Sequence, residues 1–285
     1  MEARKLPQAT PDAGRDLGPI HPGSGRRTDL LKRIGGTAAA IGLVLVKFGA
    51  KAKVVLLALT KVKMFSTSAS MLVSIVAYQL IFGWLFSVGF VLLLLLHELG
   101  HVFQLRREGV KASAPMFIPF LGAVISAKSL GDDAAAEARV GLAGPILGSI
   151  ATLVPLGIWL ATGSDFWQAL AFIGFFLNLF NLLPILPLDG GRAMAALSPW
   201  VWLVGLVGLV AMVFFFPSPV LLLILLLGGW ESWRRWKTRN TPESRAYHRI
   251  PARTRALVAA TYLALIVALA IGTSATHLER SLSDV

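Results

Sequence analysis

The sequence predicts an all-α polytopic membrane protein with about six to seven transmembrane helices. Of the 285 residues, 55% are hydrophobic and the mean hydropathy is +0.70, values that exceed those of an ordinary globular domain. Apolar runs long enough to enter a bilayer recur along the chain, with most charged residues between them. The net charge of +12 would suit nucleic acid, but the basic residues lie in predicted loops, so no nucleic-acid partner is expected.

The N-terminal part is divided at about residue 29. Residues 1–29 are rich in Pro, Gly and charge and lack the compact apolar region of a signal peptide, which predicts a disordered cytoplasmic tail. Residues 30–66 are apolar but interrupted by lysines, and Ile34 to Val46, their longest uncharged stretch, is too short to cross about 30 Å of hydrocarbon. We therefore predict amphipathic helices on the inner membrane surface. A tilted span with a snorkelling Lys47 is the competing interpretation.

Seven apolar segments follow, of which most or all are predicted to span the bilayer. Their predicted bounds are Thr67–Leu85, Phe86–Leu105, Val140–Ala161, Trp167–Leu186, Val201–Phe216, Val220–Trp236 and Leu257–Ile271. Residues 67–236 would form the core of the protein, residues 237–256 a basic cytoplasmic loop, and residues 257–285 a final transmembrane helix with a short tail.

The apolar segment Val110–Ala127 differs from these spans because prolines and a glycine interrupt it. Pro115, Pro119 and Gly122 make a continuous helix unfavourable. The pattern instead predicts a β-hairpin or loop that re-enters the membrane. Irregular backbone is tolerated at that depth only where protein or a water-filled cavity satisfies its polar groups.

Basic residues predict the orientation. With the N-terminus inside the cell, all of the 27 Lys and Arg residues except Arg280 fall on one side of the membrane. By the positive-inside rule this side is cytoplasmic. The chain also lacks an organelle-type transit peptide, so we expect a multi-pass protein of a prokaryotic cytoplasmic membrane.

The most informative polar residues follow the apolar run Leu92–Leu96. His97, Glu98 and His101 lie there in an HExxH arrangement, although a polar group buried without a partner costs about 2–7 kcal/mol. The spacing places both histidines on one face of a helix, where they can share a metal ion. Glu98, about 100° round the helix, could take a proton from water at that metal. This end of the helix is predicted to lie within the membrane, near its cytoplasmic face.

The sequence contains no cysteine, so any third metal ligand must be His, Asp or Glu. Asp189, at the end of another predicted span, is the best candidate; the alternative is a turn or helix-capping aspartate before two glycines. The remaining acidic candidates lie in a polar stretch typical of a solvated face or in an external turn, and they are Asp132, Asp133, Glu137 and Asp165.

Two motifs together resemble the site-2 protease family, the intramembrane zinc metalloproteases of peptidase family M50. They are HELGH, ending at His101, and NLLPILPLDGG, which begins at Asn181 and contains Asp189. The resemblance extends over about Phe86 to Leu197 and includes Ala143–Pro145, which looks like a small-residue turn of that family. The chain resembles a short form, with no PDZ or CBS domain expected.

The resemblance implies that His97, His101 and Asp189 hold one Zn²⁺ per chain and that Glu98 is the catalytic glutamate. It also implies that Asn181 helps to position the substrate or to polarise its carbonyl group. Asn178 has no implied role and is interpreted as a hydrogen-bonding residue between helices.

The implied reaction is hydrolysis of a peptide bond within or near a transmembrane segment, as in regulated intramembrane proteolysis. The implied partners are the lipid bilayer, a single-span membrane substrate such as an anti-sigma factor, and an upstream site-1-type protease. An intramembrane metal-binding transporter and a non-catalytic membrane scaffold remain as alternatives. Glu98 distinguishes a transporter from a protease, because a transporter has no evident use for a base beside the metal. A structural zinc site would normally need a fourth ligand, and the sequence offers no clear candidate.

Overall fold

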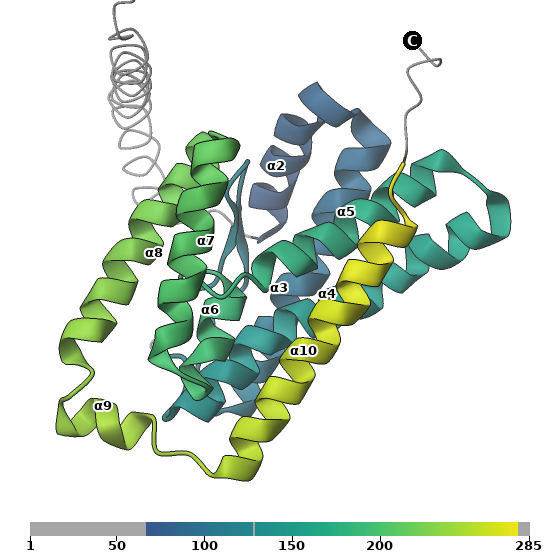
Figure 1. Cartoon of the computed structure of the whole chain (residues 1–285). Coiled ribbons are helices and arrows are strands. Elements are labelled where there is room, and N and C mark those ends of the chain that lie inside the picture. Colours follow the sequence, from purple (N-terminus) through teal and green to yellow (C-terminus); the bar gives the residue numbers. More distant parts are fainter. Residues whose placement is uncertain (1–66, 128, 279–285) are drawn as a thin grey trace, which may run out of the picture. The chain divides into compact units, whose positions relative to one another are not determined.

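The computed structural model describes residues 67–127 and 129–278, which form a mainly helical fold (Figure 1). The predicted tail and surface helices of residues 1–66 lie outside the described residues. The helical elements, in chain order, are α2 (Thr67–Phe82), α3 (Trp84–Arg107), α4 (Ala134–Thr162), α5 (Asp165–Asn181), α6 (Asp189–Ala193), η1 (Met194–Ala196), α7 (Pro199–Phe215), α8 (Pro219–Thr238), α9 (Pro242–Tyr247) and α10 (Ala252–Ala275).

Each predicted span coincides with a helix, although the bounds differ by several residues. Three helices, α3, α4 and α10, are both long and apolar enough to cross a membrane. The apolar helix α2 and the Trp202–Phe215 part of α7 are shorter than a typical span. The mainly helical fold is therefore confirmed, whereas the count of six to seven spans stays a prediction.

Helix α4 lies at the centre of the described fold and contacts α3, α5, α6 and α10 (Figure 1). Small residues permit the close approach of α3 to α4, since a Cβ atom on Gly100 of α3 would collide with the carbonyl group of Ala143 in α4. Around α4, a core of buried side chains includes Leu142, Phe175 and Tyr262. The prediction of a turn at Ala143–Pro145 is wrong, because these residues lie within α4, whose neighbours support a helix that contains proline.

The polar stretch before α4 also differs from its prediction. Asp133 caps the helix by accepting a hydrogen bond from Ala136 N at 2.7 Å. Glu137 is buried rather than part of a solvated face: its carboxylate binds Arg235 at 2.7 and 3.0 Å and accepts a hydrogen bond from Tyr247 Oη at 2.7 Å. These partners offset the cost of burying the charge and tie α4 to α8 and α9.

A β-hairpin forms within the predicted Val110–Ala127 segment. Strand β1 (Met116–Ile118) pairs antiparallel with β2 (Gly122–Val124). Strand β1 lies against α2, where the Phe117 N–H donates to Ser70 Oγ at 3.1 Å. The outer edge of β1 is thus occupied by α2. The hairpin is confirmed, and its insertion into the membrane remains a prediction.

Candidate active site

Helix α3 carries the HExxH residues at its buried, C-terminal half. His97, Glu98 and His101 all have exposed fractions of 9% or less. The two imidazole rings lie on one face of the helix with their centroids 4.9 Å apart, as the four-residue spacing predicts. The sequence places these polar groups after an apolar run, and the fold encloses them with α4, α5 and α6.

Asp189, the first residue of α6, completes the cluster from a distant part of the chain. Its Oδ2 atom lies 3.1 Å from Nε2 of His97 and 3.1 Å from Nε2 of His101. The side chain does not cap α6 but is directed toward the two imidazoles. The structure therefore brings together His97, His101 and Asp189, whose candidate ligand atoms all lie within 4.8 Å of one another.

Hydrogen bonds determine which nitrogen of each imidazole faces the cluster. His101 Nδ1 donates to the carbonyl oxygen of Val140 at 2.8 Å. His97 Nδ1 lies 2.8 Å from Asn178 Oδ1, and Asn178 Nδ2 donates to the carbonyl oxygen of Gly174 at 2.8 Å. Because the Asn178 amide nitrogen is used in this way, its oxygen must be the acceptor for His97. In the neutral imidazoles, both Nε2 atoms therefore present lone pairs to the cluster.

These groups fit a zinc ion. The two Nε2 atoms are 3.2 Å apart, so the three candidate ligand atoms form a nearly equilateral triangle. Ligand distances of about 2.0–2.1 Å in a tetrahedral zinc site correspond to separations of about 3.3 Å between ligand atoms. Three acceptor atoms that face one another without a donor would repel, and a bound cation removes that repulsion. Three protein ligands also leave one coordination position open.

Two further residues shape the candidate metal centre. A Cβ atom on Gly144 would overlap the imidazole of His101, so this position of α4 accommodates only glycine without displacement of that imidazole. The guanidinium of Arg192 lies 3.7 Å from Asp189 Oδ1, the carboxylate oxygen that does not face the histidines. This ion pair orients the carboxylate so that Oδ2 remains directed at the imidazoles.

Glu98 adjoins the metal centre without taking part in the triangle. It follows His97 by one residue, which rotates its side chain about 100° around α3. Its carboxylate forms no hydrogen bond or ion pair with another residue in the described parts of the chain. A buried carboxylate without protein partners is available to water or to a substrate.

The two asparagines of α5 have different surroundings. Asn181, the predicted substrate-positioning residue, donates from Nδ2 to the carbonyl oxygen of Leu177 at 3.1 Å and has no described contact with the metal-site residues. Asn178, for which no catalytic role was predicted, bonds directly to His97. The predicted hydrogen bond between helices is present, but the sequence did not show that its partner would be a metal-site histidine. The one signal in the sequence was the three-residue spacing of Asn178 and Asn181, which places both asparagines on the same side of a helix.

Comparison with known proteins agrees with this geometry. The sequence profile of peptidase family M50 matches residues 85–164 and 158–203, a region that includes all residues of the candidate metal centre. Zinc metalloprotease MJ0392 of Methanocaldococcus jannaschii is 32% identical over 112 residues, which cover 36% of this chain and 31% of that protein.

A putative zinc metalloprotease of Mycobacterium tuberculosis, Rip3, is 36% identical over 135 residues, which cover 42% of this chain and 33% of the relative. The matched region thus spans about a third of the length of each relative. The family profile also matches the helices that carry His97, His101 and Asp189. Over residues 85–203 the chain is therefore similar to peptidase family M50.

Proposed function

We propose that the protein is an intramembrane zinc metalloprotease, which hydrolyses a peptide bond within or near a transmembrane segment of a membrane-protein substrate. The observation that carries this proposal is the buried triangle of His97, His101 and Asp189 beside the unpaired carboxylate of Glu98. One relative is named a zinc metalloprotease and the other a putative zinc metalloprotease, which agrees with a hydrolytic role for the shared core.

In this proposal His97, His101 and Asp189 hold Zn²⁺. When bound, the ion supplies Lewis-acid chemistry that makes water more acidic and polarises a substrate carbonyl group. Glu98 accepts the proton of the attacking water and then donates a proton to the leaving amine. Asn181 is one helical turn beyond Asn178 on α5 and donates a hydrogen bond to the substrate, where it helps to position the peptide.

The hairpin provides a means to hold an unwound substrate. Because the Phe117 N–H points to α2, its pair with Ala123 is one of the non-hydrogen-bonded pairs of the ladder. The N–H and C=O groups of Ala123 therefore point away from β1, toward the edge of β2 that no described strand covers. A transmembrane helix must unwind before its peptide bonds can be cleaved, and an extended substrate could pair with this edge.

The proposed orientation follows the positive-inside rule. The C-terminal end of α3, which carries Arg106 and Arg107, would face the cytoplasm together with the N-terminus of the chain. The metal centre would then lie in the membrane near the cytoplasmic face of a prokaryotic cell membrane. A single-span regulator such as an anti-sigma factor, precut by a site-1-type protease, is the expected kind of substrate.

The test compares membrane proteomes of cells that express wild-type protein or Glu98→Gln at matched levels. Short single-span fragments should accumulate in the variant, because the change removes the base but retains the metal ligands. Zinc content of both purified proteins is the control and should be equal. If both proteins bind zinc and transport a metal equally well while no fragment differs, the protease proposal is wrong and a transporter takes its place.

A further inference from the structure

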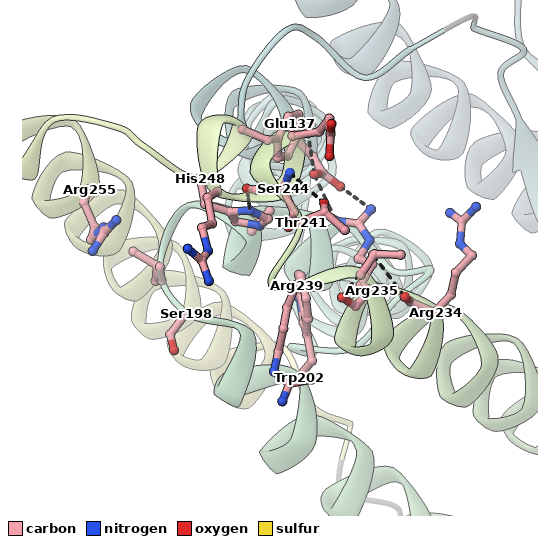
Figure 2. Close-up of a pocket in the computed structure, with 16 residues that line it drawn as sticks. Glu137, Ser198, Trp202, Arg234, Arg235, Arg239, Thr241, Ser244, His248 and Arg255 are labelled. Carbon is pink, nitrogen blue, oxygen red and sulfur yellow. Dashed lines mark hydrogen bonds and ion pairs between the residues drawn. The ribbon is translucent and has the colours of Figure 1, made fainter.

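A cavity that contains none of the residues of the candidate metal centre lies where α8, α9 and the start of α10 meet (Figure 2). Its volume is about 850 Å³. This lies within the range of about 300–1,000 Å³ that is typical of small-molecule sites. The cavity is large enough for a nucleotide or a phospholipid headgroup, and nothing in the proposed proteolytic mechanism uses it.

The wall of this cavity is strongly basic. Its lining carries two carboxylates, Glu137 and Glu243, against several guanidinium groups. The lining arginines are Arg234, Arg235, Arg239, Arg245 and Arg255. In the view of Figure 2, Arg255 from α10 and Arg234 from α8 stand on opposite sides of the cavity. A ligand between them would meet positive charge from more than one helix.

Part of this charge is already neutralised within the protein. Arg235 binds Glu137 and, at 3.0 Å, Glu231, while Arg234 binds Glu231 at 2.7 Å. Burial and the adjacent Glu137 carboxylate raise the pKa of Tyr247, which keeps its phenol protonated as a hydrogen-bond donor. This network forms a rigid wall and leaves Arg234 and Arg235 with little unbalanced charge for a ligand.

The other arginines of the lining are not neutralised. Within the described parts of the chain, Arg239, Arg245 and Arg255 have no carboxylate within ion-pair distance. Arg239 is held in place, since it lies over the Trp236 ring at 4.1 Å and donates to the Trp236 carbonyl oxygen at 2.7 Å. Three unbalanced guanidinium groups therefore outnumber Glu243, the remaining unpaired carboxylate of the lining.

His248 supplies an unsatisfied polar atom in the same wall. Its Nδ1 donates to the carbonyl oxygen of Ser244 at 2.7 Å, and its Nε2 is buried without a hydrogen-bond partner among the described residues. Because Nε2 is enclosed by protein atoms, it makes the wall more polar but does not face a ligand in the cavity.

From these observations we propose that this cavity is a binding site for a phosphate-bearing anion, held by Arg239, Arg245 and Arg255. The planar guanidinium group donates paired hydrogen bonds that match phosphate oxygens. Two sources share this chemistry, a soluble phosphate compound and the headgroup of an anionic lipid. The exposed Trp230 and Trp233 side chains near the same end of α8 are typical of residues at a membrane interface, where such headgroups are present.

Two basic residues outside the cavity provide a matched control for general attraction to positive charge. Arg249 and Arg253 lie on the same part of the chain, are exposed and do not line the cavity. The double variant Arg249→Gln/Arg253→Gln therefore removes the same charge as Arg245→Gln/Arg255→Gln. All four side chains lack described ion-pair partners, so both double variants should retain the fold.

The experiment titrates the detergent-solubilised full chain with two separate probes, inorganic pyrophosphate and a short-chain phosphatidylglycerol. Binding is followed by calorimetry, with short-chain phosphatidylcholine, which is zwitterionic and carries no net charge, as the comparison. We expect saturable binding of at least one probe by the wild type. Affinity should fall at least about tenfold in Arg245→Gln/Arg255→Gln, since two charge-assisted contacts are lost, and less than about twofold in the control variant.

The two probes also distinguish the source of the ligand. Selective binding of pyrophosphate supports a soluble phosphate compound, selective binding of phosphatidylglycerol supports a lipid headgroup, and binding of both supports the shared site. Equal losses in the two double variants would show mere attraction to a basic surface and overturn the proposal. So would the absence of saturable binding of either probe by the wild type. No proteolysis is measured, so this result is independent of the proposed catalytic function.

Discussion

Replacement of Asn178 by leucine should weaken zinc binding although Asn178 is not a ligand. Leucine has a similar shape, which matters because Asn178 packs closely against Gly148. The change removes the acceptor of the 2.8 Å hydrogen bond from His97 Nδ1 and so leaves a buried N–H group without a partner. It also releases the constraint that keeps His97 Nε2 directed toward the metal centre.

The expected size of this effect follows from the contact that is lost. Removal of a hydrogen-bond partner from a metal-binding histidine typically lowers metal affinity about 10–100-fold. That range corresponds to about 1.4–2.8 kcal/mol. Zinc affinity would be measured by competition with a chromogenic chelator on the purified, metal-depleted full chain, together with its thermal unfolding midpoint.

The matched control is Asn181→Leu, one turn further along α5. Its side chain donates to Leu177 O and does not reach His97, so zinc affinity should stay within about twofold of wild type. If Asn178→Leu also binds zinc within twofold of wild type, the hydrogen bond does not orient His97 and the reasoning fails. Equal weakening in both variants would instead indicate general damage to α5.

Three other changes test separate parts of the structure. Gly144→Ala should reduce zinc content of the purified protein at least about tenfold, because a Cβ atom there displaces the His101 imidazole; retention of full zinc content would contradict the close contact. Glu137→Gln should lower the free energy of unfolding by up to about 3 kcal/mol, measured by thermal denaturation, because Arg235 loses its buried partner; an unchanged midpoint would show that the pair contributes nothing net. Ala123→Pro should lower cleavage of a model transmembrane substrate more than Ala123→Ser, because proline removes the outward N–H of β2 but not a bond to β1; equal activities would count against strand addition.

Patterns within one helix were predictable from the sequence. The four-residue spacing of His97 and His101 defines a helical face, and the alternatives to Asp189 were few because the chain has no cysteine. The broken apolar segment predicted a hairpin because Pro115 and Pro119 exclude a continuous helix.

Features that depend on the approach of distant helices were not predictable in the same way. Glu137 appeared to be solvated because its partners, Arg235 and Tyr247, are about a hundred residues away, and only the fold shows that they offset its burial. The link between Asn178 and His97 likewise depends on how α5 packs beside α3. A single sequence specifies donors and acceptors but not which of them meet across helices.

One face of α4 connects these separate features. Glu137, Val140 and Gly144 follow one another at spacings of three and four residues, so they lie along the same side of the helix. Glu137 is held by Arg235 at the basic cavity, Val140 accepts the hydrogen bond from His101, and Gly144 provides the space for that imidazole. The ion pair therefore fixes the turn of α4 that immediately precedes the support of a metal-site histidine. Loosening this turn in Glu137→Gln should displace the Val140 carbonyl group, so a loss of stability in that variant should be accompanied by weaker zinc binding.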